Sequence, residues 1–292
     1  MPAIAPSRVT ILRLAQRLPT TPAVLGKLQR LLANTDSDLE EVCKLLKRDL
    51  ALSVRILRIS NSPFYGSSNP HTSLEEAVGC VGFNEIYKVV GLTVTSQLFN
   101  CDLRSYGYQA DRLWENILCT ALAMESLAQF AGINPRSAYT SGLMRSIGKI
   151  VLDRLAAEVG VADAAFPADG STPLCDWERQ VFGCDNTFVA ALLMKEWNLS
   201  EDSISAIRGH YFPEGDSEGD LPAYVLNLAG TIAQDLGYGL AGEETYWGSL
   251  DTKLTRAQID EGEFALCTAE TKMAFETVRK IFSDSTELSP AS

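Results

Sequence analysis

Histidine, the side chain that most often ligates a transition metal, is almost absent from this sequence. The chain has 292 residues and two histidines, His71 and His210, which lie far apart in the sequence. Its carboxylates show no clustered spacing that would supply a ligand set instead. The sequence therefore gives no support to a conventional metal centre, and we expect no cofactor.

Paired cysteines and long apolar runs are missing as well. The seven cysteines include no C-x-x-C pair, and their odd number favours small buried side chains in a reducing compartment. The notable uncharged stretch, residues 89–101, is too short and too polar to span a membrane. The first 18 residues carry three arginines and no apolar block, so they do not read as a secretory signal. We expect a cytoplasmic protein without a membrane partner.

Positive charge is scarce overall but concentrated towards one end of the chain. The net charge is −12, from 25 Lys+Arg and 37 Asp+Glu. Residues 1–70 hold ten basic and five acidic residues, a balance of +5, so the remaining 222 residues carry −17. We expect no nucleic-acid partner, because phosphate contacts need clustered basic side chains. The N-terminal charge is either a basic contact face or a solvated helix surface.

What the sequence does contain is repeated helical periodicity. Capped apolar stripes predict helices over residues 50–60, 112–131, 174–182, 186–197, 222–236 and 269–282. Residues 89–95 are rich in β-branched side chains and would pass as a strand on propensity alone. The spacing of the surrounding apolar residues favours a buried helix instead. We therefore predict an all-α protein.

One segment, residues 140–153 (TSGLMRSIGKIVLD), resembles the signature helix of the HD superfamily of metal-dependent phosphohydrolases. That signature reads small-Gly-Leu-apolar-His-Asp-Ile-Gly-Lys, and Gly142-Leu143 and Ile147-Gly148-Lys149 match it. Arg145 and Ser146 stand in place of the His-Asp pair. Arginine is always protonated and offers no lone pair to a metal, so the chemistry of the signature is lost while its frame is kept.

Four further segments narrow the resemblance. They are 18–24 (LPTTPAV), 48–66 (RDLALSVRILRISNSPFYG), 73–82 (SLEEAVGCVG) and 182–197 (FGCDNTFVAALLMKEW). In this order they resemble the HDOD family, the HD-related output domains of bacterial signalling proteins, over roughly residues 11–240. The resemblance implies an N-terminal helical lobe packed on an HD-like helical lobe. The expected division is a tail at 1–10, lobes at 11–110 and 111–240, a helical extension at 241–282 and a disordered tail at 283–292.

The resemblance also gives the positions where the superfamily places its metal ligands. In this chain those positions hold Asn116, Arg145, Ser146, Asn186 and Gly230. His210 stands near an expected histidine, and we expect it to make an ordinary hydrogen bond. Lys149 is expected to be solvated or paired near a helix N-terminus. Alternatively, Arg145, Lys149 and His210 contact a small molecule in the vacated pocket, since two cations one turn apart can bind a phosphate.

We expect a non-catalytic signal-transduction module that acts by protein–protein contact in a bacterial two-component or cyclic-nucleotide-linked pathway. One alternative is a sensor that binds a nucleotide or other small molecule; a second is a residual metal-dependent phosphohydrolase. No receiver, kinase, cyclase or DNA-binding segment is visible, so the input is expected from a separate protein or a longer chain. The expected partner surface comprises Lys44, Lys47, Arg48, Arg55, Arg58, Phe64 and Tyr65.

Overall fold

The computed structural model describes residues 5–19, 22–33, 38–62, 70–160, 165–167, 170, 172–211 and 220–287. In these ranges the regular structure is helical, and the sole extended pairing is an isolated bridge between Leu103 and Tyr108. Residues 89–95 lie inside α6 (Phe83–Leu98), so the helix predicted there is confirmed. The all-α prediction is confirmed too.

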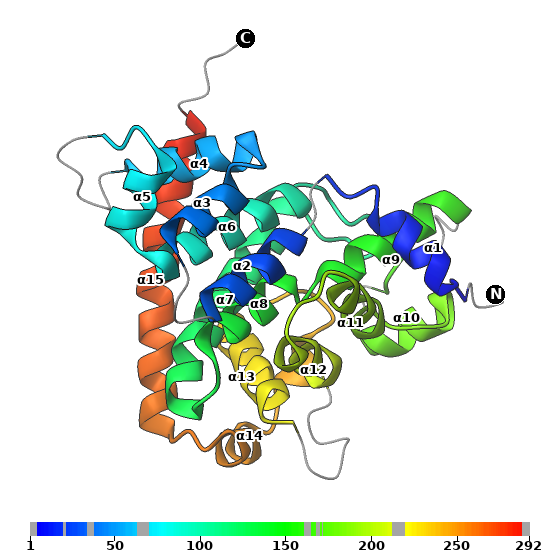
Figure 1. Ribbon diagram of the computed structural model, residues 1–292. Coiled ribbons are helices and arrows are strands. Elements are labelled where there is room, and N and C mark those ends of the chain that lie inside the picture. Colours follow the sequence, from blue (N-terminus) through cyan, green and yellow to red (C-terminus); the bar gives the residue numbers. More distant parts are fainter. Residues whose placement is uncertain are drawn as a thin grey trace.

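The N-terminal part of the chain is a group of helices arranged around α6 (Figure 1). In order they are α2 (Ala23–Ala33), α3 (Leu39–Leu46), α4 (Leu50–Ser60), α5 (Leu74–Val81) and α6. Local capping sets several of these starts. The Asp49 carboxylate accepts a hydrogen bond from the amide of Leu52, and Ser73 and Glu76 form a capping box at α5.

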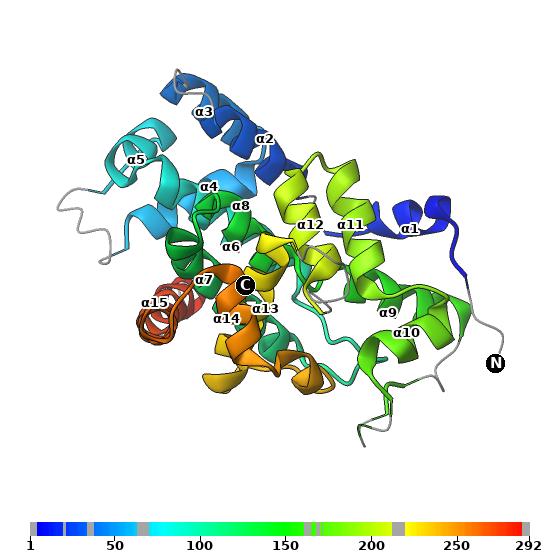
Figure 2. The ribbon, with the colours of Figure 1, turned by 90° about the horizontal axis from the view of Figure 1, so that it is seen from below.

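The first helix, α1 (Arg8–Ala15), packs away from this group. It lies against α9 and α11 (Figure 2), and Arg13 and Arg17 both pair with Glu158 near the end of α9. The N-terminal helix thus contacts the segment that the sequence assigned to the second lobe.

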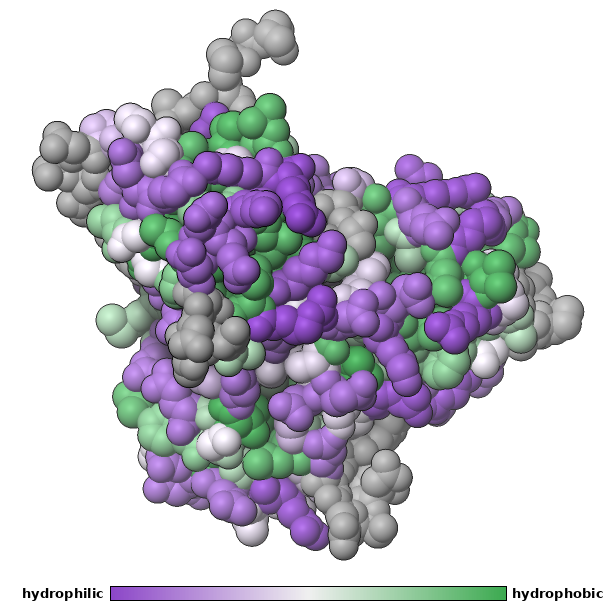
Figure 3. All heavy atoms as spheres, viewed as in Figure 1, coloured by the Kyte–Doolittle hydropathy of each residue, from purple (hydrophilic) through white to green (hydrophobic). Residues whose placement is uncertain are grey.

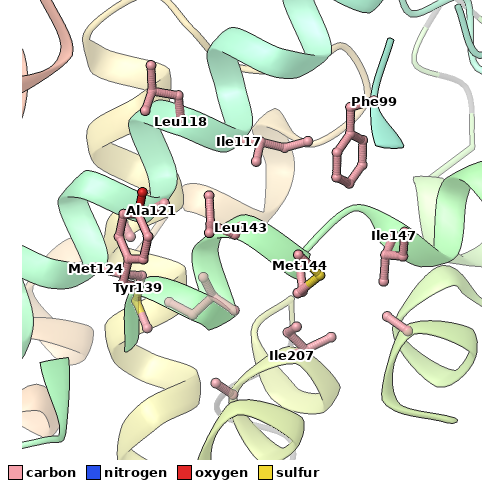
Figure 4. Packing of buried hydrophobic residues seen from close by; sticks show 14 of the residues in the cluster. Phe99, Ile117, Leu118, Ala121, Met124, Tyr139, Leu143, Met144, Ile147 and Ile207 are labelled. Atoms are coloured by element: carbon pink, nitrogen blue, oxygen red, sulfur yellow. The ribbon is translucent and has the colours of Figure 1, made fainter. Parts of the chain in front are cut away.

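The second part of the chain is a larger bundle. Its helices are α7 (Ala110–Ala131), α8 (Pro135–Met144), α9 (Ile147–Val159), α10 (Leu174–Phe182), α11 (Asn186–Glu196), α12 (Glu201–Gly209) and α13 (Leu221–Asp235). Figure 4 shows how Ile117, Met144 and Ile207 follow one another across its core, from α7 through α8 to α12. All three side chains are buried.

Two glycines set how closely these helices approach. A Cβ added to Gly142 would lie 2.4 Å from the Ala121 Cα atom, and one added to Gly148 would lie 2.0 Å from the Asn186 carbonyl oxygen. The backbones of α8 and α7, and of α9 and α11, therefore touch at these points. No larger residue fits without moving a helix.

The signature segment 140–153, expected as one helix, is split in two. α8 ends at Met144, α9 begins at Ile147, and Arg145 and Ser146 form the link between them. Periodicity could not show this break, because residues 137–152 are all buried and present no exposed face whose direction changes.

The C-terminal part differs most from expectation. After α13 come a short 3₁₀ turn (Glu244–Trp247), α14 (Leu250–Ala257) and α15 (Glu261–Glu287). The sequence predicted a helical extension over 241–282 but no separate helix at α14, and it placed the start of the last helix near residue 269. Residues 283–287, assigned to a disordered tail, belong to α15, while 288–292 lie outside the described residues. α15 packs along α7 and also contacts α4 (Figure 1).

Among the described helices, none is by itself long and apolar enough to cross a membrane. α5 and α6 pass that test only when taken together, with a bend of 116° between them.

We expect Gly142→Ala to lower the free energy of unfolding by about 1–3 kcal/mol, because its Cβ would meet the backbone of α7 rather than a movable side-chain end. Gly79→Ala is the matched control. Gly79 lies on the exposed side of α5 with nothing within 4 Å of an added Cβ, so helix propensity should raise the stability by up to about 1 kcal/mol. Urea denaturation measures both. Equal midpoints for Gly142→Ala and the parent would contradict the close crossing.

Candidate functional site

The link between α8 and α9 directs two positive side chains into the protein interior. Arg145 belongs to the link itself, and Lys149 lies in the first turn of α9. Both side chains have an exposed fraction of 0%. Of the two expectations for Lys149, the solvated side chain is wrong, and the structure has it paired in the first turn of a helix. Two buried cations need a buried anion, since an unpaired charge in the interior is very costly.

That anion is Glu243, which lies on the loop after α13. Lys149 Nζ is 2.6 Å from its Oε1 atom, and Arg145 Nη2 is 2.8 Å from its Oε2 atom. The Tyr211 hydroxyl donates to Oε1 at 2.6 Å and accepts a hydrogen bond from Lys149 at 2.8 Å. One fully buried carboxylate is thus shared by two cations and a hydroxyl group.

Two of the mapped ligand positions also belong to this cluster. Asn116, on α7, accepts a hydrogen bond from Arg145 Nη2 through Oδ1 at 2.6 Å and donates to the Tyr238 carbonyl through Nδ2 at 2.8 Å. Ser146 Oγ lies 3.4 Å from Lys149 Nζ. Both positions now serve the internal pairing of protein groups.

Gly230 joins the same cluster indirectly. A Cβ at this position would lie 2.7 Å from the indole ring of Trp247. The guanidinium carbon of Arg145 lies 5.4 Å from the centroid of that ring, at a cation–π distance. Trp247 therefore fills the space into which an acidic side chain at position 230 would project.

Asn186, the remaining mapped position, is bound to a second buried acid. Its backbone amide and its Nδ2 both donate to Glu178 Oε2 at 2.8 Å, and the Tyr106 hydroxyl donates to Oε1 at 2.7 Å. Burial raises the pKa of Glu178 to about 7, although the charge of Lys149 and these hydrogen bonds oppose the rise. Glu178 thus changes charge near neutral pH beside the cluster.

His210 lies at the C-cap of α12 and is fully buried. Its Nδ1 atom is 2.8 Å from the Ile207 carbonyl oxygen, to which it donates. Burial and the charge of Arg145 lower the pKa of His210 to about 3, so the ring is neutral at neutral pH. Its Nε2 atom, then a lone-pair acceptor, has no hydrogen-bond partner among the described residues. A neutral acceptor does not attract an anion.

Burial and the short distances between Arg145, Lys149 and Glu243 together shift the pKa values of all three groups. Burial alone would raise the pKa of Glu243, but Arg145 and Lys149 outweigh it and hold that pKa at about 2. The pKa of Arg145 is raised, because Glu243 overcomes the effect of burial, whereas burial prevails at Lys149 and lowers its pKa. We assign Lys149 as an ammonium group, since its neighbours Ser146, Tyr211 and Glu243 all accept from it.

Sequence reasoning found half of this site. It identified the cations and the mapped positions but missed Glu243, Glu178 and Tyr211. Among the described residues, no three His, Cys, Asp or Glu side chains are grouped as a metal site requires. The donor set fits a metal poorly, because the positions where ligands are expected hold a guanidinium group, two amides, a hydroxyl group and a glycine.

The predicted partner surface lies on α3 and α4. Lys44, Lys47, Arg48 and Arg58 are exposed and Arg55 is half-buried. Burial, and then the charge of Arg58, lower the pKa of Arg55. Lys47 pairs with Glu75 of α5. Phe64 and Tyr65 lie outside the described residues.

The sequence profile of the HDOD domain matches residues 18–213. Among solved structures, the chain is similar to an HDOD domain protein of unknown function from Geobacter sulfurreducens, with 21% identity, a TM-score of 0.68, and coverage of 97% of this chain and 98% of that one. A candidate signal transduction protein from Marinobacter aquaeolei VT8 is 18% identical, with a TM-score of 0.70. The match covers 91% of this chain and 60% of that one. At these identities the likeness shows the fold.

Two further likenesses extend this picture. A candidate phosphohydrolase from Shewanella amazonensis SB2B is 24% identical with a TM-score of 0.65, covering 91% of this chain and 96% of that one. An uncharacterized protein of Treponema pallidum (strain Nichols) is 24% identical over 196 residues. That alignment covers 66% of this chain and 37% of the relative, so the chain spans well under half of its length.

The raised pKa of Glu178 predicts a pH dependence. Its carboxyl binds a proton more tightly in the folded protein, with a pKa of about 7, than in the unfolded chain, near 4.5. The resulting stabilisation is complete below pH 4.5 and is lost as the pH rises through 7. Relative to Glu178→Gln, the free energy of unfolding of the parent should therefore fall by up to about 3 kcal/mol from pH 4.5 to 8. Parallel stability curves in guanidinium denaturation would refute this assignment.

Proposed function

The chain belongs to the HDOD family, and we propose that it is a non-catalytic signal-transduction module that acts by contacting another protein in a bacterial two-component or cyclic-nucleotide-linked pathway. The observation that carries the proposal is the buried pairing of Arg145 and Lys149 with Glu243. These groups lie at and beside the positions where HD phosphohydrolases hold their metal, and their pairing leaves a net charge of +1 there.

Hydrolysis of a phosphoester by an HD site requires a metal to activate water and to bind the phosphate. Here the positions expected to supply lone pairs carry a guanidinium group, an amide and a hydroxyl, and none binds a divalent metal as a carboxylate or an imidazole would. The charges of Arg145 and Lys149 would also repel a metal ion. These features favour contact rather than catalysis.

A contact surface is available on α3 and α4. Two apolar side chains, Leu50 and Val54, are 77% and 49% exposed there. They lie on α4 near the exposed basic residues Arg48 and Arg58. Figure 3 shows the hydrophilic side chains that gather over α2 to α4, with hydrophobic ones beside them. Exposed apolar groups bordered by charge are typical of interaction sites.

The charge of this face indicates the kind of partner. Residues 38–60, which span α3 and α4, hold five basic and four acidic residues, a balance of +1 within a chain of −12, so this segment is slightly basic while the rest of the chain is acidic. Such a face steers an acidic protein into contact and rejects a basic one. We therefore propose an acidic signalling protein as the partner, with Leu50 and Val54 as the apolar centre of the contact.

The test reverses three exposed charges, as Lys44→Glu, Arg48→Glu and Arg58→Glu in one variant. Partner capture from the native cell extract should weaken at least about tenfold, because steering and complementarity are both lost. Raising the salt concentration should weaken capture by the parent in the same way.

The matched control reverses three exposed basic residues elsewhere, Lys195, Arg256 and Lys272, which gives the same change in net charge. It should capture the partner as the parent does. Equal capture by the α3–α4 variant and the parent would place the working surface on another face.

A further inference from the structure

The loop that carries Glu243 has an unusual backbone. Residues 237–243, which we call the strap, read GYGLAGE. Gly237 and Gly242 both have a φ of 85°, in the left-handed region that favours glycine. A glycine with a left-handed backbone therefore stands at the first residue of the strap, and another stands directly before Glu243.

The strap is fastened mainly through its backbone carbonyls. Arg112 donates to the carbonyls of Gly237 and Gly239, Asn116 to that of Tyr238, and the Tyr108 hydroxyl to that of Ala241. Only Glu243 and Leu240, 1% exposed, anchor it through fully buried side chains. Tyr238 adds a partly buried ring whose centroid lies 4.2 Å from that of Phe275, so opening the strap breaks this contact as well as the pairing of Glu243.

A groove of about 430 Å³ runs beside the strap. Tyr108, Arg112, Gln234, Leu240 and Glu244 are among the residues that line it. Strap residues 237 and 239–241 form part of the same lining, so solvent reaches the strap through this groove. The groove gives a ligand a route towards Arg145 once the strap moves.

The cluster beneath the strap is built for an oxyanion but is only partly used. Arg145 donates through Nη2 alone; its Nε and Nη1 atoms are buried and have no hydrogen-bond partner among the described residues. A carboxylate has two oxygens, and both are already engaged by Arg145, Lys149 and Tyr211. A tetrahedral phosphate has further oxygens for the unused donors of the guanidinium fork.

We propose that Glu243 is a built-in competitor for an oxyanion site formed by Arg145, Lys149 and Tyr211, and that a phosphate group replaces its carboxylate when the strap opens. In the closed state the site is occupied by the protein itself. The apparent affinity for phosphate is then reduced by the small fraction of molecules in which the strap is open. The site shares no residue with the α3–α4 face, so either proposal can fail without the other.

The experiment measures the binding of inorganic phosphate by calorimetry, with potassium chloride at matched ionic strength as the reference. Glu243→Ala removes the competitor and should bind phosphate at least about tenfold more tightly than the parent. Adding Lys149→Met to that variant should abolish the gain. The control is Asp251→Ala, which removes an exposed acid on α14 outside the groove and should bind as the parent does. No gain in Glu243→Ala overturns the proposal.

Glu243→Ala leaves two buried cations without a carboxylate and can fail to fold. A measurement on the parent covers that case. Phosphate should accelerate amide hydrogen exchange within residues 237–242 relative to chloride, while exchange in α7 stays the same. Unchanged exchange in the strap at the highest phosphate concentration overturns the proposal.

A further arm compares inorganic phosphate with adenosine monophosphate. Tighter binding of the nucleotide identifies the phosphate as part of a larger ligand that also lies in the groove. Equal binding identifies free phosphate as the ligand.

Discussion

The sharing of one buried carboxylate by two buried cations is the constraint on which the rest of this structure depends. Arg145 and Lys149 cannot stay charged inside a helical bundle without Glu243, and Glu243 cannot reach them unless the strap crosses α7. The contacts of Asn116, Tyr211 and the strap carbonyls follow from that need. These contacts thereby hold together α7, the link between α8 and α9, the end of α12 and the strap.

The survival of the HD-like frame has a separate cause. Gly142 and Gly148 are required by the close approach of helix backbones, whatever side chains follow them. Ile147 and Leu143 fill the core around those crossings. The resemblance therefore persists at positions fixed by packing and fails at positions fixed by metal chemistry. A motif can keep its apolar and glycine residues for the fold alone.

The helices were predictable because each depends on local information. Caps at Asp49 and Ser73 and apolar spacing within a single helix need no knowledge of distant residues. The site was not predictable in the same way, because Glu243 is separated by 98 and 94 residues from its two partners. No periodicity links residues so far apart, and charged residues are ordinarily expected at the surface. The break at Arg145–Ser146 was hidden for a related reason, since both of its flanks are buried.

The most direct test of the central claim, that protein charges have replaced a metal, is the metal content of the protein purified without chelators. Elemental analysis should find no stoichiometric iron, manganese, zinc or nickel, because Arg145 and Lys149 occupy the site with charges of the wrong sign. A stoichiometric metal that supports hydrolysis of a phosphoester, with the turnover lost in His210→Ala, would contradict the claim.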